Sequence, residues 1–227
     1  GTLVNGEITI TFENDANYPG GIVLKKLTRH PNEQFSLNSL ADIEKDTGLV
    51  PTTLGSCFAS WNNNLVSYVL PASLRKIEDR AFSMCKKVRN VPNLPPELEE
   101  IGYEAFFANE SAKGSIVIPK NIRVIEKNSF YGCGNAIGIH FTQGSKLERI
   151  EDSAFKRCHC VDGTLDLSIC KNLKFIHPLA FVNCEPDRVI YGKEYRKHIE
   201  NQLKASDKEN SYPRASTDWF AGAFGIG

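Results

Sequence analysis

The sequence predicts an α/β-type repeat solenoid, in which short parallel strands stack in successive coils. The main observation is a segment that begins with Ile, ends with Phe five residues later, and recurs at nearly constant spacing. A fixed period of roughly 20–29 residues indicates a solenoid in which each coil is one repeat. The copies are Ile77–Phe82, Ile101–Phe106, Ile125–Phe130, Ile150–Phe155 and Ile176–Phe181, so successive steps are 24, 24, 25 and 26 residues.

Further columns appear when the copies are aligned on the Ile. The residue three positions earlier is apolar in every copy, the residue before Phe is small, and the third residue after Phe is Cys or Asn. Short runs typical of β-strands lie ahead of the copies, and Pro ends some of them, since Pro cannot donate to a ladder. The columns are Leu74, Leu98, Ile122, Leu147 and Leu173; Ala81, Ala105, Ser129, Ala154 and Ala180; and Cys85, Asn109, Cys133, Cys158 and Cys184.

Stacking explains why these columns recur. An isolated coil of about 24 residues cannot bury enough apolar surface to fold. When coils stack, the Ile of one lies over the Ile of the next, and the Phe over the Phe. We therefore expect the Ile and Phe that begin and end each copy to form the core. Each such side chain contributes roughly 1.5–3 kcal/mol before the entropy cost is counted.

These residues carry a resemblance to a known family. The stretch Leu-Pro-Ala-Ser-Leu-Arg-Lys-Ile-Glu-Asp-Arg-Ala-Phe-Ser-Met-Cys at 70–85 resembles the BspA-like leucine-rich repeat, also called the Treponema pallidum type. The resemblance covers roughly residues 51–192; Gly144 and Cys170 replace the usual Pro, and Asn109 replaces the usual Cys. It implies a right-handed solenoid of short parallel strands joined by short helical or irregular turns.

The ends of the chain depart from the repeat, as terminal coils do because one stacking face must be sealed from water. Residues 1–50 are expected to form an N-terminal cap segment, with a strand at Glu7–Phe12 and a short helix at Ser39–Lys45. Phe58 lies 24 residues before Phe82 and indicates a degenerate first coil. About five to six coils are therefore expected between residues 51 and 192.

After the repeats, apolar residues recur every four positions, as on one side of a helix. They are Tyr191, Tyr195, Ile199 and Leu203. We interpret residues 193–205 as a C-terminal capping helix, with a partner-binding helix as the alternative. Residues 206–227 are expected to be a flexible tail, in which Trp219–Phe224 either docks on the body or begins a further segment.

Composition excludes several classes of function. The chain of 227 residues has 27 basic and 27 acidic side chains, interspersed, so neither nucleic acid nor an anionic membrane is an expected partner. No apolar stretch approaches the roughly 20 residues of a membrane span. No signal peptide is visible, and the sequence begins with Gly1, which suggests a processed or trimmed chain from which an export signal is missing.

Seven cysteines raise the question of metal or disulfide chemistry. Four of them share one column of the repeat, which predicts buried free thiols. The alternative is a metal site at Cys158-His159-Cys160, but this stretch lacks the second pair of ligands that zinc sites need. No nucleophile elbow, phosphate loop or dinucleotide fingerprint is present. The sequence therefore predicts no catalytic residue, no metal site and no cofactor.

Recognition is expected on the exposed positions of the strands, because solenoids bind partners on a long face. These positions form a neutral stripe of mostly small side chains, suited to a protein or glycan; the alternative is a solvated sheet without a ligand. We call this stripe the strand face. Its residues are Ser67, Val69, Val91, Asn93, Ser115, Val117, His140, Thr142, Asp166 and Ser168.

The family resemblance implies a secreted or cell-surface protein, of a bacterium or a mucosal parasite, that binds host extracellular or neighbouring-cell proteins in adhesion. Two other hypotheses stay open from the residues alone. One is a structural spacer within a longer surface protein. The other is an enzyme, which would need several polar groups to converge in a deep pocket. The oligomeric state is not predicted.

Overall fold

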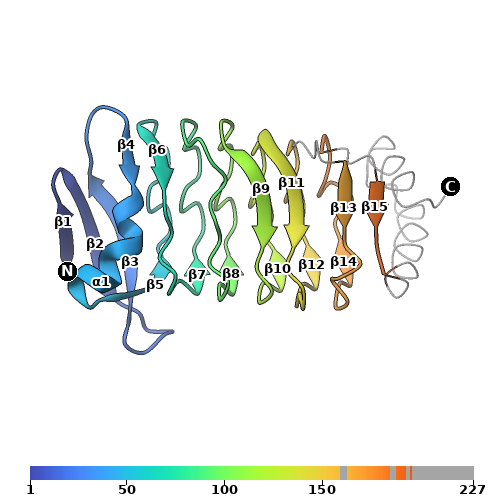
Figure 1. The fold of residues 1–227 in the computed structure, drawn as a ribbon, viewed down its shortest axis with the longest axis horizontal. Helices are drawn as coiled ribbons and strands as arrows, with labels where there is room; N and C mark the ends of the chain where they lie inside the picture. The colour runs from blue at the N-terminus through green and yellow to red at the C-terminus, as the bar shows by residue number, and fades with distance from the viewer. Residues whose placement is uncertain (159–162, 185–187, 193–194, 196–227) are drawn as a thin grey trace.

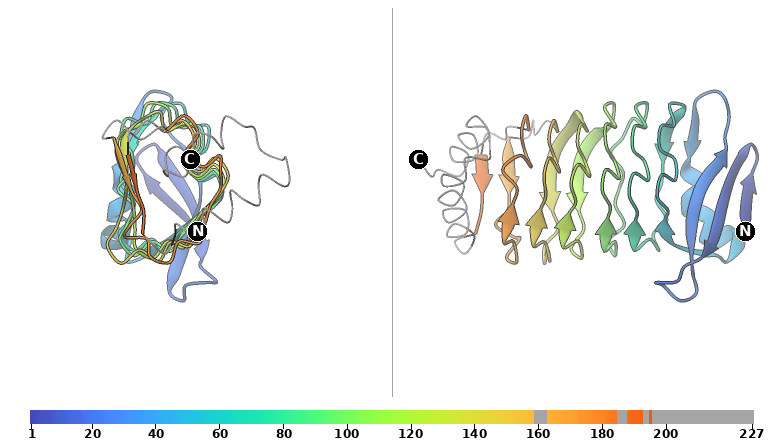
Figure 2. Two further views of the ribbon diagram at one scale, coloured as in Figure 1. Left: turned by 90° about the vertical axis from the view of Figure 1, so that its right-hand side faces the viewer. Right: turned by 180° about the vertical axis from the view of Figure 1, so that it is seen from behind.

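The computed structural model describes residues 1–158, 163–184, 188–192 and 195. Its coils stack along one axis, with the N-terminus at one end of the stack (Figure 1). Seen down that axis, successive coils superimpose in one outline (Figure 2). The solenoid predicted from the period is therefore confirmed.

Two rows of parallel strands form opposite sides of the coils (Figure 1). In the first row β4 pairs with β6, β9 with β11, and β13 with β15, all in parallel. The strands of this row are β4 (Phe35–Leu37), β6 (Leu65–Tyr68), β9 (Lys113–Ile118), β11 (Asn135–Phe141), β13 (Thr164–Asp166) and β15 (Arg188–Ile190).

The second row was not anticipated from the sequence. It places the Ile column in two-residue strands, with Ile77 opposite Ile101 and Ile150 opposite Ile176. The strands of this row are β5 (Val50–Leu54), β7 (Lys76–Ile77), β8 (Glu100–Ile101), β10 (Val124–Ile125), β12 (Arg149–Ile150) and β14 (Phe175–Ile176).

The bend that carries each Phe is irregular and not helical. In the copies ending at Phe82, Phe106, Phe130 and Phe155, the residues two before and two after the Phe have left-handed backbone conformations, as at Arg80 (φ 57°) and Met84 (φ 61°). In the last copy, of this pair only Asn183, two after Phe181, does. The N–H of Phe82 donates to the carbonyl of Ala105 in the next coil at 2.8 Å, and Phe106 donates likewise to Ser129. These bonds satisfy buried backbone groups without a helix. No described residue of the coils is helical, so of the expected turns only the irregular kind occurs there.

The predicted core is confirmed. All ten Ile and Phe side chains of the repeat are at most 2% exposed. From Phe82 to Phe181 the rings stack one coil on the next, with centroids 5.3–6.0 Å apart and planes within 15° of parallel. The thiols of Cys85, Cys133 and Cys158 are buried and unbridged, as expected, and Cys184 is buried as well. Cys158 donates to the carbonyl of Phe130 at 2.9 Å.

The coil containing Phe58 is displaced by one residue relative to the others. The N–H of Ala59 donates to the carbonyl of Ala81, so Ala59, and not Phe58, occupies the backbone position equivalent to Phe82. The left-handed residues Cys57 and Trp61 flank Ala59 in the same way. The ring of Phe58 still reaches the Phe column, but it meets Phe82 edge-on, at 70°. The spacing of 24 residues therefore located the ring correctly and the backbone register wrongly.

The N-terminal segment begins with an antiparallel meander of β1 (Thr2–Asn5), β2 (Ile8–Asn14) and β3 (Gly21–Arg29). Strand β3 then pairs in parallel with β5, which joins the segment to the solenoid. The expected short helix is present as a 3-10 turn, η1 (Asn38–Asp42), followed by α1 (Ile43–Thr47). It ends at Gly48, whose φ of 73° is the left-handed conformation that closes many helices.

Buried Asp15 fastens the meander to the first coil. Its carboxylate accepts hydrogen bonds from the hydroxyls of Thr52 and Thr53, at 2.9 and 2.6 Å. Burial opposes ionisation, but these bonds and the N–H of Asn17 stabilise the charged form and leave the pKa of Asp15 below its ordinary value.

Most of the expected C-terminal capping helix at 193–205 and the whole tail at 206–227 lie outside the described residues. Tyr195 is described: it is buried, and its N–H donates to the carbonyl of Gly192 at 3.1 Å. The helix and the Trp219–Phe224 segment stay predictions.

Candidate binding surfaces

The strand face predicted from the sequence follows the first row of strands. Five of its ten residues are exposed and five are half-buried. The exposed ones are Val69, Asn93, Val117, His140 and Asp166; the half-buried ones are Ser67, Val91, Ser115, Thr142 and Ser168. In β9 and β11, Val117 lies opposite His140, so the structure brings these two together.

Several polar groups of the strand face are bonded within the protein. The hydroxyl of Ser67 donates to that of Ser36 at 2.7 Å, and the hydroxyl of Thr142 donates to the carbonyl of Ile118 at 2.9 Å. Ser168 donates to the carboxylate of Asp166. These groups stabilise the coils and are less available to a ligand.

What the strand face exposes is partly apolar. Val69 and Val117 are each 48% exposed, and so is Ile137, which the sequence analysis missed. Ile137 lies at an irregularity where the register of β11 against β9 shifts between Ala136 and Gly138. A bulge of this kind leaves the extra residue unpaired and turns its side chain outward. Repeat spacing could not reveal it.

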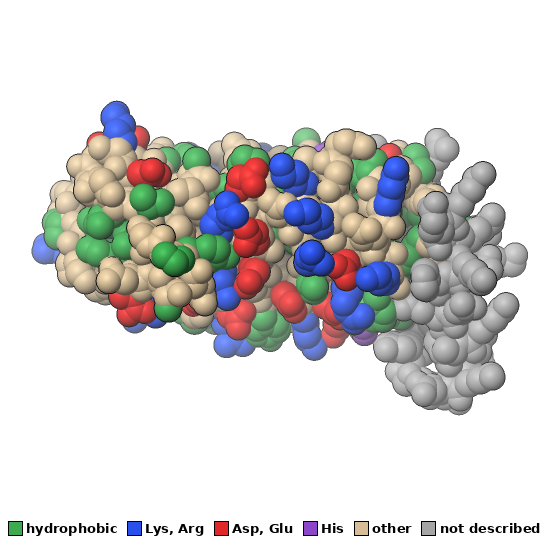
Figure 3. Space-filling model, turned by 90° about the horizontal axis from the view of Figure 1, so that it is seen from below, with side chains coloured by type: hydrophobic (Ala, Val, Ile, Leu, Met, Phe, Trp, Pro, Cys, Tyr) green, Lys and Arg blue, Asp and Glu red, His purple; other side chains and the backbone are tan. Residues whose placement is uncertain are grey.

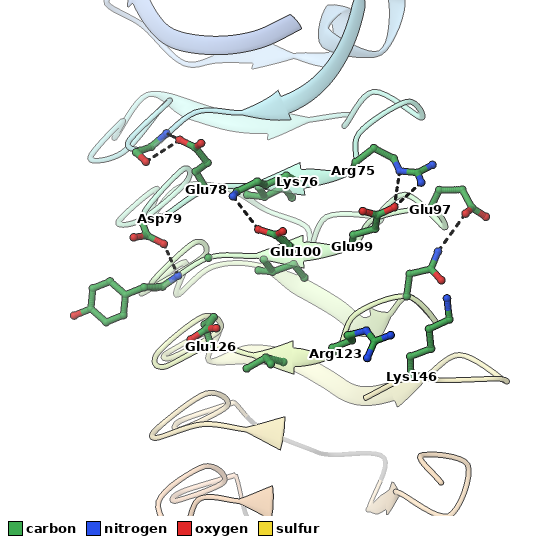
Figure 4. Close-up of a pocket in the computed structure, with 17 residues that line it drawn as sticks. Arg75, Lys76, Glu78, Asp79, Glu97, Glu99, Glu100, Arg123, Glu126 and Lys146 are labelled. Atoms are coloured by element: carbon green, nitrogen blue, oxygen red, sulfur yellow. Dashed lines mark hydrogen bonds and ion pairs between the residues drawn. The ribbon is translucent and has the colours of Figure 1, made fainter. Parts of the chain in front are cut away.

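A groove of about 1100 Å³ runs over the second row of strands. Four consecutive coils supply charged side chains to it (Figure 4). We call it the charged groove. Its lining includes Arg75, Lys76, Glu78, Asp79, Glu97, Glu99, Glu100, Gly102, Tyr103, Asn121, Arg123, Glu126 and Lys146.

Charge alternates along the column two residues before each Ile. The column reads Arg75, Glu99, Arg123, Glu148 and Lys174. Adjacent members pair: Nε of Arg75 lies 3.0 Å from Oε1 of Glu99, and Nη1 of Arg123 lies 2.6 Å from Oε1 of Glu148. Glu148 also pairs with Lys174 at 3.1 Å. The column therefore ties the Arg75 coil to the Glu99 coil, and the Glu148 coil to the coils on both sides of it.

Across the groove, one coil is acidic and the following coils are rich in bases. Glu97, Glu99 and Glu100 of one coil form an acidic stripe. Lys120, Arg123 and Lys146 of the next two coils form a basic stripe beside it. The space-filling view from this side shows red and blue side chains gathered in neighbouring stripes (Figure 3). The chain is neutral overall, yet this face has a strongly patterned charge.

Gly102 deepens the groove at its centre. A Cβ at this position would lie 2.6 Å from the backbone nitrogen of Asp79, so no larger residue fits without a shift. Its counterpart one coil on is Glu126. Partial burial and the nearby carboxylates of Glu151 and Asp79 raise the pKa of Glu126 above its ordinary value.

Tyr18 links the N-terminal meander to the groove. Its hydroxyl donates to Oε2 of Glu99 at 3.1 Å. Burial, together with the negative charge of Glu99, raises the pKa of Tyr18 to about 12. Glu99 is therefore held from both sides, by Tyr18 and by Arg75, which fixes the acidic stripe in place.

The groove is an open hollow lined by charged side chains. Some of them form ion pairs between coils, such as Arg75 with Glu99 and Lys76 with Glu100, whereas Glu78 accepts a hydrogen bond from Ser56. Among the described residues, no group of three or more His, Cys, Asp or Glu side chains is arranged to hold a metal ion. The helices of the described part of the chain are all too short or too polar to cross a bilayer.

Comparison with known proteins supports the repeat architecture. The chain is similar in structure to a leucine rich cell surface protein from Faecalibacterium prausnitzii A2-165, with 16% identity and a TM-score of 0.56, over 83% of this chain and 54% of that one. It is also similar to the pneumococcal vaccine antigen PcpA, with 16% identity and a TM-score of 0.57, over 86% of this chain and 51% of that one. The chain thus spans about half the length of each, and at this identity the likeness concerns the fold.

No curated protein matches the chain. The sequence profile described as the BspA type leucine rich repeat region matches residues 52–186, in 6 copies. These limits agree with the coils found in the structure, including the displaced coil around Ala59. Since the profile covers more than half of the sequence, the chain belongs to the BspA type leucine-rich-repeat family.

Proposed function

We propose that this chain is a non-catalytic recognition module of a cell-surface or secreted protein, that it binds a protein partner, and that its biological role is adhesion to host or neighbouring cells. The observation that carries the proposal is the charged groove, a hollow with patterned charge on a rigid stack of coils. Rigid elements hold a binding surface at low entropy cost. The surface location is supported by the two similar structures, which are those of a cell surface protein and of a vaccine antigen.

The charged groove is a better candidate contact than the strand face. It is concave, and its acidic and basic stripes can select a partner of complementary pattern. The strand face is neutral, and the hydroxyls of Ser67 and Thr142 are engaged within the protein. It stays a second proposed contact, for a protein or glycan. A spacer without a ligand is the alternative function.

The test is a binding screen of the intact chain against arrays of extracellular proteins and of glycans. The groove variant combines Glu97→Lys with Lys146→Glu, which reverses one charge in each stripe and leaves the net charge at zero. The strand-face variant replaces His140, Thr142 and Asp166 with Ala. We expect protein binding that the groove variant loses and the strand-face variant retains.

Each other result has a definite meaning. Binding that only the strand-face variant loses would move the contact to that face. Binding that both variants retain would exclude both surfaces. An intact chain that binds nothing on either array, although folded, would favour the spacer.

A further inference from the structure

We propose that a row of apolar and aromatic side chains on the bends of the solenoid is a second interaction surface, which binds an extended peptide segment of a partner protein. The segment would carry apolar side chains beside a carboxylate. The row lies apart from the lining of the charged groove and from the strand face. We call it the aromatic ridge, and its residues are Trp61, Met84, Phe107, Tyr131 and Arg157.

Backbone hydrogen bonds make the ridge continuous from coil to coil. The N–H of Met84 donates to the carbonyl of Phe107 at 2.7 Å, and the N–H of Ala108, next to Phe107, donates to the carbonyl of Tyr131 at 2.7 Å. Neighbouring coils are roughly 4.8 Å apart, so the four steps from Trp61 to Arg157 span roughly 19 Å. An extended peptide of about six residues has this length.

Trp61 is the most exposed aromatic feature of the ridge. Its side chain is 67% exposed, and its φ is 61°. The equivalent residues of other coils, such as Met84 and Arg157, have the same left-handed conformation, so this φ belongs to the bend of the repeat. The bend leaves the ring of Trp61 outside the core. A large rigid ring held out in water is the kind of side chain that dominates protein interfaces.

Phe107 and Tyr131 supply a half-buried platform in the middle of the ridge. Their rings stack with centroids 4.9 Å apart and planes 19° from parallel. The preceding side chain, Met84, is half-buried and unbranched, so it can adapt to the shape of an apolar partner.

Cations at the far end of the ridge define the chemistry of the partner. The guanidinium carbon of Arg157 lies 5.8 Å from the ring centroid of Tyr131, and the Lys156 ammonium lies 6.0 Å from it. Neither cation forms an ion pair with a described residue. A cation beside an aromatic ring is suited to a carboxylate that approaches over apolar surface. This complementarity favours an acidic peptide.

The experiment pans a displayed library of random short peptides against the intact chain, followed by fluorescence anisotropy with the selected peptides. We expect them to share apolar or aromatic residues and at least one Asp or Glu. Trp61→Ser and Arg157→Glu should each weaken their binding at least about tenfold. The matched control is Val4→Ser, which removes an apolar side chain that is 69% exposed on β1, outside the ridge, and should change nothing.

Several results would overturn the proposal. Selected peptides that bind Trp61→Ser and Arg157→Glu as well as the intact chain would place their site elsewhere, and a library without binders would exclude a peptide ligand of this length. The oligomeric state of the chain without peptide is also measured, by sedimentation. A dimer that Trp61→Ser dissociates would show that the ridge pairs two copies of this chain. Circular dichroism confirms that each variant is folded.

Discussion

In the Phe column the same side chain recurs from coil to coil, whereas in the column two residues before each Ile the charge alternates. Phe106, Phe130 and Phe155 stack as parallel rings in the interior. At the surface, Arg75 meets Glu99 and Arg123 meets Glu148. Both columns have one residue per coil, yet the first repeats the same residue, whereas in the second the sign of the charge changes from one coil to the next.

The difference follows from what stacking does to each kind of group. Identical rings one coil apart fill space at normal packing density and exclude water. Identical charges at that spacing would repel, while opposite charges attract. The interior therefore supplies most of the stability, and the surface column adds a weak preference for the correct neighbour. The predictions below test this division, starting with the interior.

Truncation of a central ring should have the largest effect. Phe130→Ala removes a side chain that is stacked on both sides, and we expect a loss of about 3–5 kcal/mol in the free energy of unfolding, measured with urea. The control is Val117→Ala at an exposed position, which should stay within about 0.5 kcal/mol of the unaltered chain. A loss of less than about 1 kcal/mol for Phe130→Ala would show that the stack is not the main source of stability.

A methyl group at the floor of the groove should have the next largest effect. Gly102→Ala places a Cβ against the backbone of Glu78 and Asp79, and we expect a loss of about 1–3 kcal/mol from overpacking. Glu126→Ala, in the same column of the next coil, is the matched control and should cost little. Equal stabilities for the two variants would mean that the coils separate easily at this point.

An unpaired hydroxyl in the interior offers a change of opposite sign. The hydroxyl of Tyr68 is buried without a hydrogen-bond partner, although its ring stacks on Phe82 at 4.0 Å. Tyr68→Phe should therefore raise the free energy of unfolding by about 1 kcal/mol. Tyr18→Phe is the contrast, because that hydroxyl bonds Glu99, so its removal should lower the stability. A loss for Tyr68→Phe would reveal a partner for its hydroxyl.

The sequence predicted the interior better than the surface for a physical reason. Burial imposes the same requirement on every coil, so Ile77, Phe82 and their counterparts could be recognised by their period. The Phe58 coil shows the limit of this reasoning. A ring can reach the same column from the adjacent backbone position, and spacing alone does not distinguish the two.

The candidate sites were harder to predict because they depend on positions that vary. Gly102 shapes the charged groove through the absence of a side chain, and Ile137 is exposed by a bulge. Alternation of charge at 75, 99 and 123 was readable in the sequence once the columns had been aligned. Ion pairs between Arg75 and Glu99 of adjacent coils could also be expected from it. The groove that these residues line could not, because strands of two residues are too short to show an alternating pattern.

Ion pairs on the surface should have a small effect that depends on salt. A double-mutant cycle with Arg75→Ala and Glu99→Ala is expected to give a coupling energy of about 0–1 kcal/mol, because both side chains are partly exposed. The coupling should decrease as salt is added, since mobile ions screen the pair. A coupling energy well above this range and unchanged by salt would show that the charged column contributes more to stability than the weak preference proposed above.

The weakest effect expected is the pH dependence due to Glu126. Partial burial and the nearby carboxylates of Glu151 and Asp79 raise its pKa in the folded protein above the ordinary value of a glutamate. The unfolded chain therefore releases this proton at lower pH than the folded protein does, so the stability that Glu126 contributes is present below the unfolded pKa and is lost as pH rises through the folded pKa. Glu126→Gln should be more stable than the unaltered chain near pH 7, and the difference should vanish at a pH below the unfolded value, as measured by urea unfolding at both pH values. An equal stability difference at the two pH values would show that Glu126 affects stability through its packing. The repulsion between its charge and those of Asp79 and Glu151 would then be negligible.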